Sequence, residues 1–305
     1  MGRGVNSAAI PVLRHGAVSV YVGEKSGKYP DGNQVTVRGA DSLAAFDTPL
    51  VANRLGSELL EADLVVLGHV HEDHMAGLHR LRHAPLYAHE ADVAAARSWE
   101  GLSRHYGYMP EVLAGMRIKV EREFHYAPRP DAQAYSDGAS WDLGGGVTVR
   151  AFHMPGHTSG HCALLVEPGG IAFIGDIDLS SFGPYYGDAT SSLTEFRRTL
   201  EAVKNIPAKV WITSHHKGVI ADRETFLVLL KAFASRLDAR EKAIADHLRQ
   251  RPSTLAELVA HRFVYPKNLD DLYYADAERR TIEQHLEALA RAGRAIDEGG
   301  RWRMA

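Results

Sequence analysis

The sequence predicts an α+β protein with a large layered domain followed by a small C-terminal domain. Short apolar runs bounded by Gly, Pro, Asn and Asp recur through the first two thirds of the chain, and they are typical of buried strands. Helical patterns separate several of these runs, which gives the strand–helix–strand rhythm of a layered fold. From about residue 240 the pattern changes to short helices and a terminal hairpin, so we predict domains over 1–239 and 240–305.

In the first half of the chain, apolar runs and helical patterns alternate. The predicted strands are 18–22, 35–37, 43–46, 64–67 and 85–88, and the predicted helices are 50–60 and 75–82. Residues 90–140 mix helical patches with aromatic and polar stretches. We interpret this segment as a partly helical insertion near the site, whose aromatics either contact substrate or cover an edge of the core.

Regular strands resume in the second half. The predicted strands are 147–152, 162–166, 171–174 and 209–213, and the predicted helices are 193–203 and 223–237. A Pro-Gly-Gly turn at 168–170 makes a hairpin of the second and third of these strands.

Four metal-ligand side chains occur within six residues, in the stretch His69-Val70-His71-Glu72-Asp73-His74. This stretch follows the apolar strand 64–67, so its side chains lie where that strand ends. In an extended segment His69 and His71 point to the same side, because residues two apart share a face. One loop could therefore supply ligands to two neighbouring metal positions, although a solvated polar loop is the alternative.

Three more candidate ligands, His157, Asp176 and His215, each follow the end of an apolar strand. Loops at strand ends can converge on one site. The seven candidates together offer nitrogen and oxygen ligands without sulfur, which suits two borderline-hard metal ions better than one. Two such ions about 3.5–4 Å apart can share a bridging water and lower its pKa towards neutrality.

The spacing His69-x-His71-x-Asp73-His74, followed by His157, Asp176 and a late histidine, resembles the metallo-β-lactamase superfamily over about residues 17–237. The resemblance implies a four-layer αβ/βα sandwich with the site along one edge of two packed sheets. It implies that His69, His71 and His157 hold one metal ion, and that Asp73, His74 and His215 hold a second. Asp176 would bridge the two. Zinc is the implied occupant, with iron or manganese as the alternatives.

Several positions depart from the family pattern or compete with the chosen ligands. The family's Asp-Thr-Gly turn appears as Asp47-Thr48-Pro49, so we expect Asp47 to support the site through a different turn. We prefer His215 to His216 as the last ligand. His153 and His161 are expected to support the backbone or the ligands rather than to bind metal.

Other polar and reactive residues near these loops have more than one interpretation. Cys162 is expected to be a small core residue on a strand. Tyr185 and Tyr186 lie in a glycine-rich loop after Asp176 and either donate to a developing oxyanion or pack over the rim. Lys217 either binds an anionic substrate group or is a solvated turn residue.

The predicted C-terminal domain has helices over 241–248, 253–259 and 277–292 and a terminal hairpin. It resembles the winged-helix domain that follows the catalytic domain in some β-lactamase-like proteins, a few of which cut single-stranded RNA. Residues 241–305 carry eleven Lys and Arg against eleven Asp and Glu, whereas nucleic-acid modules are usually basic. We therefore interpret it as a packing or homodimerisation element. Nucleic-acid binding stays an alternative, because Arg301 and Arg303 can engage phosphate and Trp302 can stack on a base.

Composition limits the class of protein. The chain has 305 residues, 45% of them hydrophobic and 24% charged, with a net charge of −3, so no overall basic field favours nucleic acid or anionic lipid. A single cysteine cannot form an internal disulfide, which favours a cytoplasmic location. Residues 1–7 do not resemble a leader, and no run of about 20 apolar residues follows, so we expect no targeting segment and no membrane span.

The sequence therefore predicts a binuclear metal hydrolase. A metal-bridging hydroxide would attack the activated carbonyl of a small-molecule ester, thioester or lactone, and Asp73 would also orient that hydroxide. A metal-dependent endoribonuclease acting on single-stranded RNA is the alternative. A non-enzymatic binding scaffold fits less well, because all seven ligand positions are filled.

Overall fold

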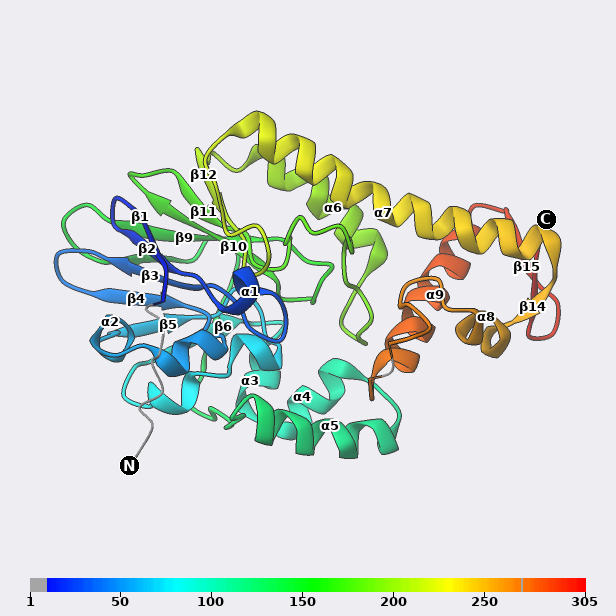
Figure 1. Ribbon diagram of the computed structural model, residues 1–305, viewed down its shortest axis with the longest axis horizontal. Coiled ribbons are helices and arrows are strands. Elements are labelled where there is room, and N and C mark those ends of the chain that lie inside the picture. Colours follow the sequence, from blue (N-terminus) through cyan, green and yellow to red (C-terminus); the bar gives the residue numbers. More distant parts are fainter. Residues whose placement is uncertain (1–9, 270) are drawn as a thin grey trace, which may run out of the picture.

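The computed structural model describes residues 10–269 and 271–305 and has two stacked sheets with helices on both outer faces. Figure 1 shows the sheets one above the other at one end of the molecule, with the helices from α2 (Ser57–Leu60) to α5 (Pro110–Glu123) beneath the first sheet, and α6 (Leu193–Ala202) and α7 (Arg223–Gln250) above the second. Helix α7 leads to a smaller lobe at the other end. The four-layer arrangement predicted from the resemblance is therefore confirmed.

The first sheet contains seven strands in sequence order. They are β1 (Val12–His15), β2 (Val18–Tyr21), β3 (Gln34–Arg38), β4 (Leu43–Phe46), β5 (Leu64–Val66), β6 (Leu86–His89) and β7 (Gln133–Tyr135). The first four strands pair antiparallel, and β4 to β7 pair parallel. Parallel pairing needs long crossover connections, and the predicted insertion supplies the last of them.

The second sheet has the order β13-β12-β11-β10-β9-β8. Its strands are β8 (Ser140–Asp142), β9 (Thr148–His153), β10 (Cys162–Glu167), β11 (Ile171–Phe173), β12 (Val210–Ile212) and β13 (Val219–Ile220). The antiparallel pairing of β10 with β11 confirms the predicted hairpin. Strands β5 and β11 both end where ligand-bearing loops begin.

The core between the sheets consists of alternate side chains from both of them. Phe46 of β4 and Phe173 of β11 meet there, with ring centroids 5.9 Å apart. Cys162 is fully buried in the same layer, which confirms its predicted role as a core residue. Burying each large apolar side chain contributes about 1.5–3 kcal/mol, so this layer holds the two sheets, and the loops at their edge, in fixed positions.

The segments around the ligand loop are less helical than predicted. The expected helix over 50–60 is divided into a 3₁₀ turn η1 (Leu50–Arg54) and a short α2 (Ser57–Leu60). The expected helix over 75–82 is wrong, since only the 3₁₀ turns η2 (Glu72–His74) and η3 (Leu78–Arg80) form. Thr48 explains this, because its backbone N–H donates to the His74 carbonyl at 2.8 Å and its carbonyl accepts from Gly77 at 2.8 Å. In a helix over 75–82 the His74 carbonyl would accept from the Leu78 backbone N–H, which in the structure donates to the Met75 carbonyl instead.

The remaining helices before the C-terminal lobe follow the predicted scheme, apart from a short helical turn at Glu24–Gly27 that the sequence did not predict. They are the short α1 (Glu24–Gly27), then α3 (Val93–Arg97), α4 (Trp99–Tyr106) and α5 (Pro110–Glu123) in the insertion, then α6 (Leu193–Ala202) and the 3₁₀ turn η4 (Val203–Asn205). The insertion is thus partly helical, as expected.

The predicted domain boundary at residue 239 falls inside one long helix, α7 (Arg223–Gln250), where the sequence predicted two shorter ones. The lobe beyond it contains α8 (Leu255–His261), α9 (Tyr274–Arg291) and the strands β14 (Ser253–Thr254), β15 (Ala295–Asp297) and β16 (Arg301–Met304). Thr254, rather than Ser253, begins α8, through a reciprocal capping box with Glu257. The two-domain division and the winged-helix identity stay predictions.

Among the helices that the structure describes, none combines the length and the apolar composition needed to cross a membrane. The expectation of no targeting segment concerns residues 1–7, which lie outside the described residues.

Candidate metal centre

The loop after β5 places its histidines and aspartate in the interior, at the edge of the two sheets. Strand β5 ends at Val66, His71 is extended, and residues 72–74 make the tight turn η2. His69, His71, Asp73 and His74 are all buried. Buried groups of this kind need partners, and the other ligand-bearing loops supply them.

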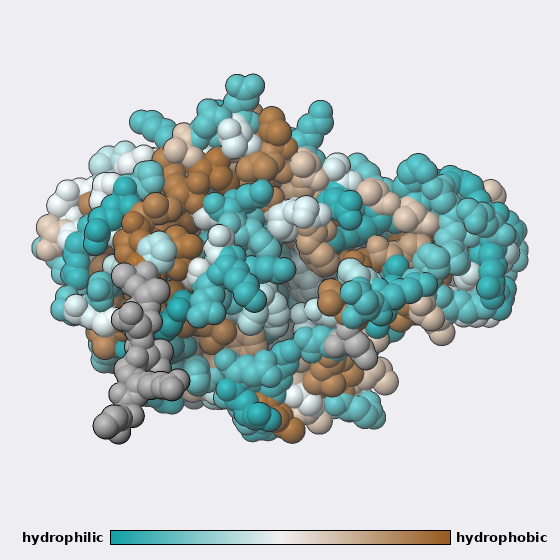
Figure 2. All heavy atoms as spheres, viewed as in Figure 1, coloured by the Kyte–Doolittle hydropathy of each residue, from teal (hydrophilic) through white to brown (hydrophobic). Residues whose placement is uncertain are grey.

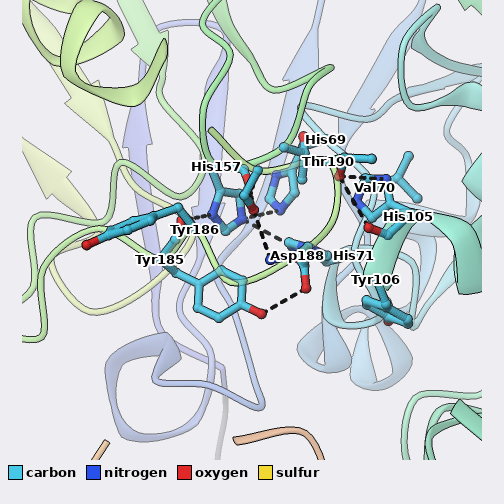
Figure 3. A network of polar contacts seen from close by, with 12 residues as sticks. His69, Val70, His71, His105, Tyr106, His157, Tyr185, Tyr186, Asp188 and Thr190 are labelled. Carbon is cyan, nitrogen blue, oxygen red and sulfur yellow. Dashed lines mark hydrogen bonds and ion pairs between the residues drawn. The ribbon is translucent and has the colours of Figure 1, made fainter. Parts of the chain in front are cut away.

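Three imidazole nitrogens converge on one point. His157 Nε2 lies 3.1 Å from His69 Nε2 and 3.1 Å from His71 Nδ1. Figure 3 shows the three rings turned towards one another, with His157 reaching across from the loop after β9. Three nitrogens at this spacing form a group that could hold a metal ion.

A second group lies beside the first and consists of Asp73, His74 and His215. Asp73 Oδ2 lies 3.2 Å from His215 Nε2 and 3.7 Å from His74 Nε2. His215 comes from the loop after β12. His216 points elsewhere: its Nε2 is 3.9 Å from Asp178, and its side chain is 32% exposed.

Asp176 contacts both groups with its two carboxylate oxygens. Oδ1 lies 3.2 Å from His74 Nε2 and 3.5 Å from His215 Nε2, while Oδ2 lies 3.5 Å from His157 Nε2. One carboxylate therefore spans the space between the two clusters, and the structure brings all seven predicted residues together.

The cluster contains atoms that a cation would satisfy. His74 Nε2 and Asp176 Oδ1 are buried and lie 3.2 Å apart, but their orientation does not make a well-aligned hydrogen bond, and neither atom has another partner among the described residues. Leaving such an atom unpaired costs about 1–3 kcal/mol. Burial lowers the pKa of His69 well below its usual value and lowers the pKa of His157 to about 3, so both rings are neutral. Neutral imidazole is the form that ligates metal, so the residues present fit a metal centre.

Each of four cluster histidines is also fixed from behind through its other ring nitrogen. His71 Nε2 lies 2.7 Å from Asp188 and His74 Nδ1 lies 2.7 Å from Asp47. His157 Nδ1 is 3.1 Å from the Tyr185 carbonyl. His215 Nδ1 is 2.9 Å from the carbonyls of Gly27 and Asp31. Such partners set the tautomer and ring orientation of metal-binding histidines.

The supporting role predicted for Asp47 is seen directly. Its Oδ2 contacts His74, and its Oδ1 accepts a hydrogen bond from the Gly68 backbone N–H at 2.7 Å. The backbone of Asp47 has a positive φ of 52°, so the turn before Pro49 is an unusual one. His161 supports Asp176 in a similar way, because its Nε2 accepts from the Asp176 backbone N–H at 3.2 Å. His153 lies beside the Ser159 carbonyl, at 2.8 Å from its Nε2.

Two buried aspartates at the site were missed by sequence reasoning. Asp188 orients His71, and Asp92 joins the ligand loops by accepting from Val70 N–H at 3.3 Å, Thr158 Oγ1 at 2.6 Å and Gly160 N–H at 2.8 Å. Neither lies at a ligand-like spacing in the sequence. The glycine-rich loop that contains Asp188 was identified in the sequence, but only its tyrosines were proposed as functional residues.

The hydroxyls of Tyr185 and Tyr186 are both engaged by protein groups. Tyr185 donates to Asp188 Oδ1 at 2.9 Å and meets the Tyr108 hydroxyl at 2.8 Å. Tyr186 lies 2.8 Å from His285 Nε2 in α9. The Tyr185 ring faces His157 and His71 (Figure 3), with centroids 5.6 and 6.1 Å apart. Lys217 is exposed.

The C-terminal lobe holds the loop that carries Tyr185 and Asp188. Buried Arg240 of α7 donates to the carbonyls of Pro184 and Phe182, and Gln284 of α9 donates to the Tyr186 carbonyl at 2.9 Å. On the other side, Asp276 accepts from the Met109 backbone at 2.7 Å. The lobe therefore contacts both flanks of the site.

Comparisons with known proteins agree with this geometry. The family described as "Metallo-beta-lactamase superfamily" matches residues 38–215. An atrochrysone carboxyl ACP thioesterase from Pseudocercospora fijiensis is 25% identical over 199 residues, 63% of this chain and 55% of the relative. The chain thus spans little more than half the length of that relative. A beta-lactamase-like protein 2 homolog from Drosophila melanogaster is 24% identical over 254 residues, covering 81% of this chain and 76% of the relative.

Solved structures share the fold. A metallo-beta-lactamase family protein from Thermus thermophilus superposes with a TM-score of 0.67 at 23% identity, covering 90% of this chain and 94% of the other. The family match covers more than half of the chain and includes all seven clustered ligands. The chain therefore belongs to the metallo-beta-lactamase superfamily.

Proposed function

We propose that this protein is a binuclear metal hydrolase that cleaves a thioester of a small organic acid. The observation that carries the proposal is the position of Asp176, whose Oδ1 lies 3.2 Å from His74 Nε2 while its Oδ2 lies 3.5 Å from His157 Nε2. A carboxylate that reaches both ligand groups is the arrangement expected for two metal ions sharing a bridging ligand.

The proposed ligand sets follow the two groups. His69, His71 and His157 would hold one ion, Asp73, His74 and His215 the other, and Asp176 both. Nitrogen and oxygen donors without sulfur suit zinc, and they also suit iron or manganese. When bound, the two ions would supply a hydroxide near neutral pH and polarise the carbonyl of the substrate.

The chain's own residues would orient the reactants. Asp73 Oδ2 faces His215 at 3.2 Å and is placed to accept a hydrogen bond from the attacking water. The reaction adds water across the carbonyl–sulfur bond and releases a carboxylic acid and a thiol. Esters and lactones undergo the same addition, so they are the neighbouring substrate classes.

The thioester preference draws support from the name of one relative, the ACP thioesterase of Pseudocercospora fijiensis. A second such thioesterase, from Passalora fulva, is 28% identical over 207 residues, covering 64% of this chain and 58% of the relative. The chain spans less than two thirds of the length of each relative. We therefore assign thioesterase activity to this chain only as part of the proposal.

Cleavage of single-stranded RNA is the alternative, and the C-terminal contacts favour it less. Arg301 lies 3.2 Å from Glu257, and Arg303 lies 2.7 Å from Glu298. Trp302 packs against the apolar core of the lobe. These arginines are already paired with carboxylates, whereas phosphate binding uses free cations.

A parallel assay of thioesters, lactones and a labelled single-stranded RNA tests the proposal on metal-loaded protein. We expect thioester turnover that is lost in Asp176→Asn and kept in Asp178→Asn, a control two residues away on the same loop. RNA cleavage that disappears in Asp176→Asn, without thioester turnover, would overturn the proposal.

A further inference from the structure

We infer that a tyrosine recess beside the metal centre binds a flat aromatic acyl group, an inference that rests on the proposed thioester hydrolysis. The recess is defined by Tyr29, Tyr185 and Tyr273, each half-buried. They come from the loop before β3, the loop after Asp176 and the segment before α9. Figure 2 shows the face hollowed between the main body and the C-terminal lobe.

Two of the three tyrosines contact the metal-ligand loop or its histidines directly. The Tyr29 hydroxyl donates to Glu72 Oε1 at 3.1 Å, next to Asp73 in sequence. The Tyr185 ring lies edge-to-face against His71 and His157. An acyl group lying against these two rings would therefore have its carbonyl end at the clustered ligands.

Tyr273 reaches the same place from the C-terminal lobe. Its ring stacks on Tyr108 with a centroid distance of 6.1 Å and an interplanar angle of 12°. Tyr108 in turn stacks on Tyr106 at 5.4 Å and 9°, and its hydroxyl lies 2.8 Å from that of Tyr185. Buried Tyr108 thus forms a rigid floor between Tyr185 and Tyr273.

The recess keeps its phenols protonated. Burial raises the pKa of Tyr29, Tyr185 and Tyr273 well above the usual value, and the nearby carboxylates of Glu72 and Asp188 raise them further. The side chains therefore offer uncharged ring faces, while the hydroxyls of Tyr29 and Tyr185 already donate to Glu72 and Asp188.

The chemistry of this lining favours a flat ring over an alkyl chain. Aromatic rings gain offset-stacked and edge-to-face contacts with one another in addition to the burial of apolar area. An alkyl group gains only the burial. Three ring-bearing side chains around a rigid tyrosine floor therefore fit an aryl group, with the thioester carbonyl projecting towards Asp176.

Phenylacetyl and cyclohexylacetyl thioesters of N-acetylcysteamine test the inference, because they differ in flatness and have no conjugated carbonyl. On metal-loaded protein we expect kcat/KM to favour the phenylacetyl thioester at least tenfold. Tyr273→Leu should bring that ratio to within about threefold of one, mainly through KM. Tyr273→Phe, which keeps the ring, and Tyr274→Leu, a neighbouring control, should retain the preference. Equal kcat/KM values for the two thioesters in the wild-type protein would overturn the inference. A preference for the phenylacetyl thioester that Tyr273→Leu does not change would also overturn it.

Calorimetric binding of the two product acids separates this inference from the proposed function. If neither thioester is hydrolysed, thioesterase activity is refuted, and the recess is judged by binding alone. Phenylacetate binding at least tenfold tighter than cyclohexylacetate, with the difference lost in Tyr273→Leu, would support the recess. Equal affinities would contradict it, whatever the turnover.

Discussion

Asp188 Oδ2 lies 2.7 Å from His71 Nε2, on the side of the ring opposite the nitrogen that meets His157. The two residues are 117 positions apart in the sequence, and both are buried. Burial alone would lower the pKa of His71, but the Asp188 carboxylate outweighs it and raises the pKa to about 9. Asp188 thus fixes the ring with Nδ1 facing the cluster.

Replacing Asp188 with Asn should weaken metal binding while leaving the seven clustered residues in place. The loss of a carboxylate behind a ligating histidine typically costs 10–100-fold in metal affinity. Competition with a chromophoric chelator measures this. Asp178→Asn is the matched control, and equal metal affinity in the Asp188 and Asp178 variants would refute the role of Asp188.

Metal affinity should rise with pH. In the metal-free protein burial opposes the charge on His215, but Asp176 and Asp73 outweigh it and raise the pKa to about 10, and His71 has a pKa of about 9. Burial also opposes the charge on His74, but Asp73, Asp176 and Asp47 outweigh it and raise its pKa well above the usual value. All three protons must leave before these rings can ligate, so each adds up to about tenfold in affinity per pH unit below its pKa. Zinc titrations at pH 6.5 and 7.5 measure the slope. A pH-independent affinity would contradict this ligand assignment.

His285→Gln should make folding less sensitive to acid. Burial, together with the nearby charges of Arg197 and Arg240, lowers the pKa of His285 to about 3. A histidine with a folded-state pKa below its unfolded value of about 6.5 contributes stability above pH 6.5 that is lost as pH falls towards 3. Denaturant unfolding of wild type should therefore lose about 1.4 kcal/mol per pH unit more than the variant over that range. Parallel profiles would exclude this contribution.

Arg240→Met should destabilise the protein and loosen the site. Arg240 is 5% exposed and donates to two carbonyls of the loop that carries Tyr185 and Asp188. Leaving these carbonyls unpaired should cost about 2–4 kcal/mol in unfolding free energy and lower metal affinity. Arg249→Met on the same helix removes an exposed pair with Asp246 and should leave the unfolding free energy nearly unchanged, because water and salt screen such pairs. Similar losses in both variants would show that the loop contacts are unimportant.

The parts of this molecule that could be predicted are those determined by short-range sequence patterns. Strand β5 and the ligands that follow it were predicted because apolar runs and ligand spacing are short-range patterns. Asp188 and Asp92 act through partners far away in the chain, so no local pattern marks them. Helix α7 continues through residue 240, where the change to short helical patterns predicted a boundary, and Arg240 is buried there against a loop far away in the sequence. The helix predicted over 75–82 failed for the same reason, since Thr48 binds its backbone.

The number of metal ions per chain tests the central proposal most directly. Metal-free protein titrated with zinc, with elemental analysis after removal of excess metal, should retain two ions per chain. Asp176→Asn should retain fewer, because its carboxylate reaches both ligand groups. Retention of a single ion by wild type, unchanged in Asp176→Asn, would contradict the binuclear centre.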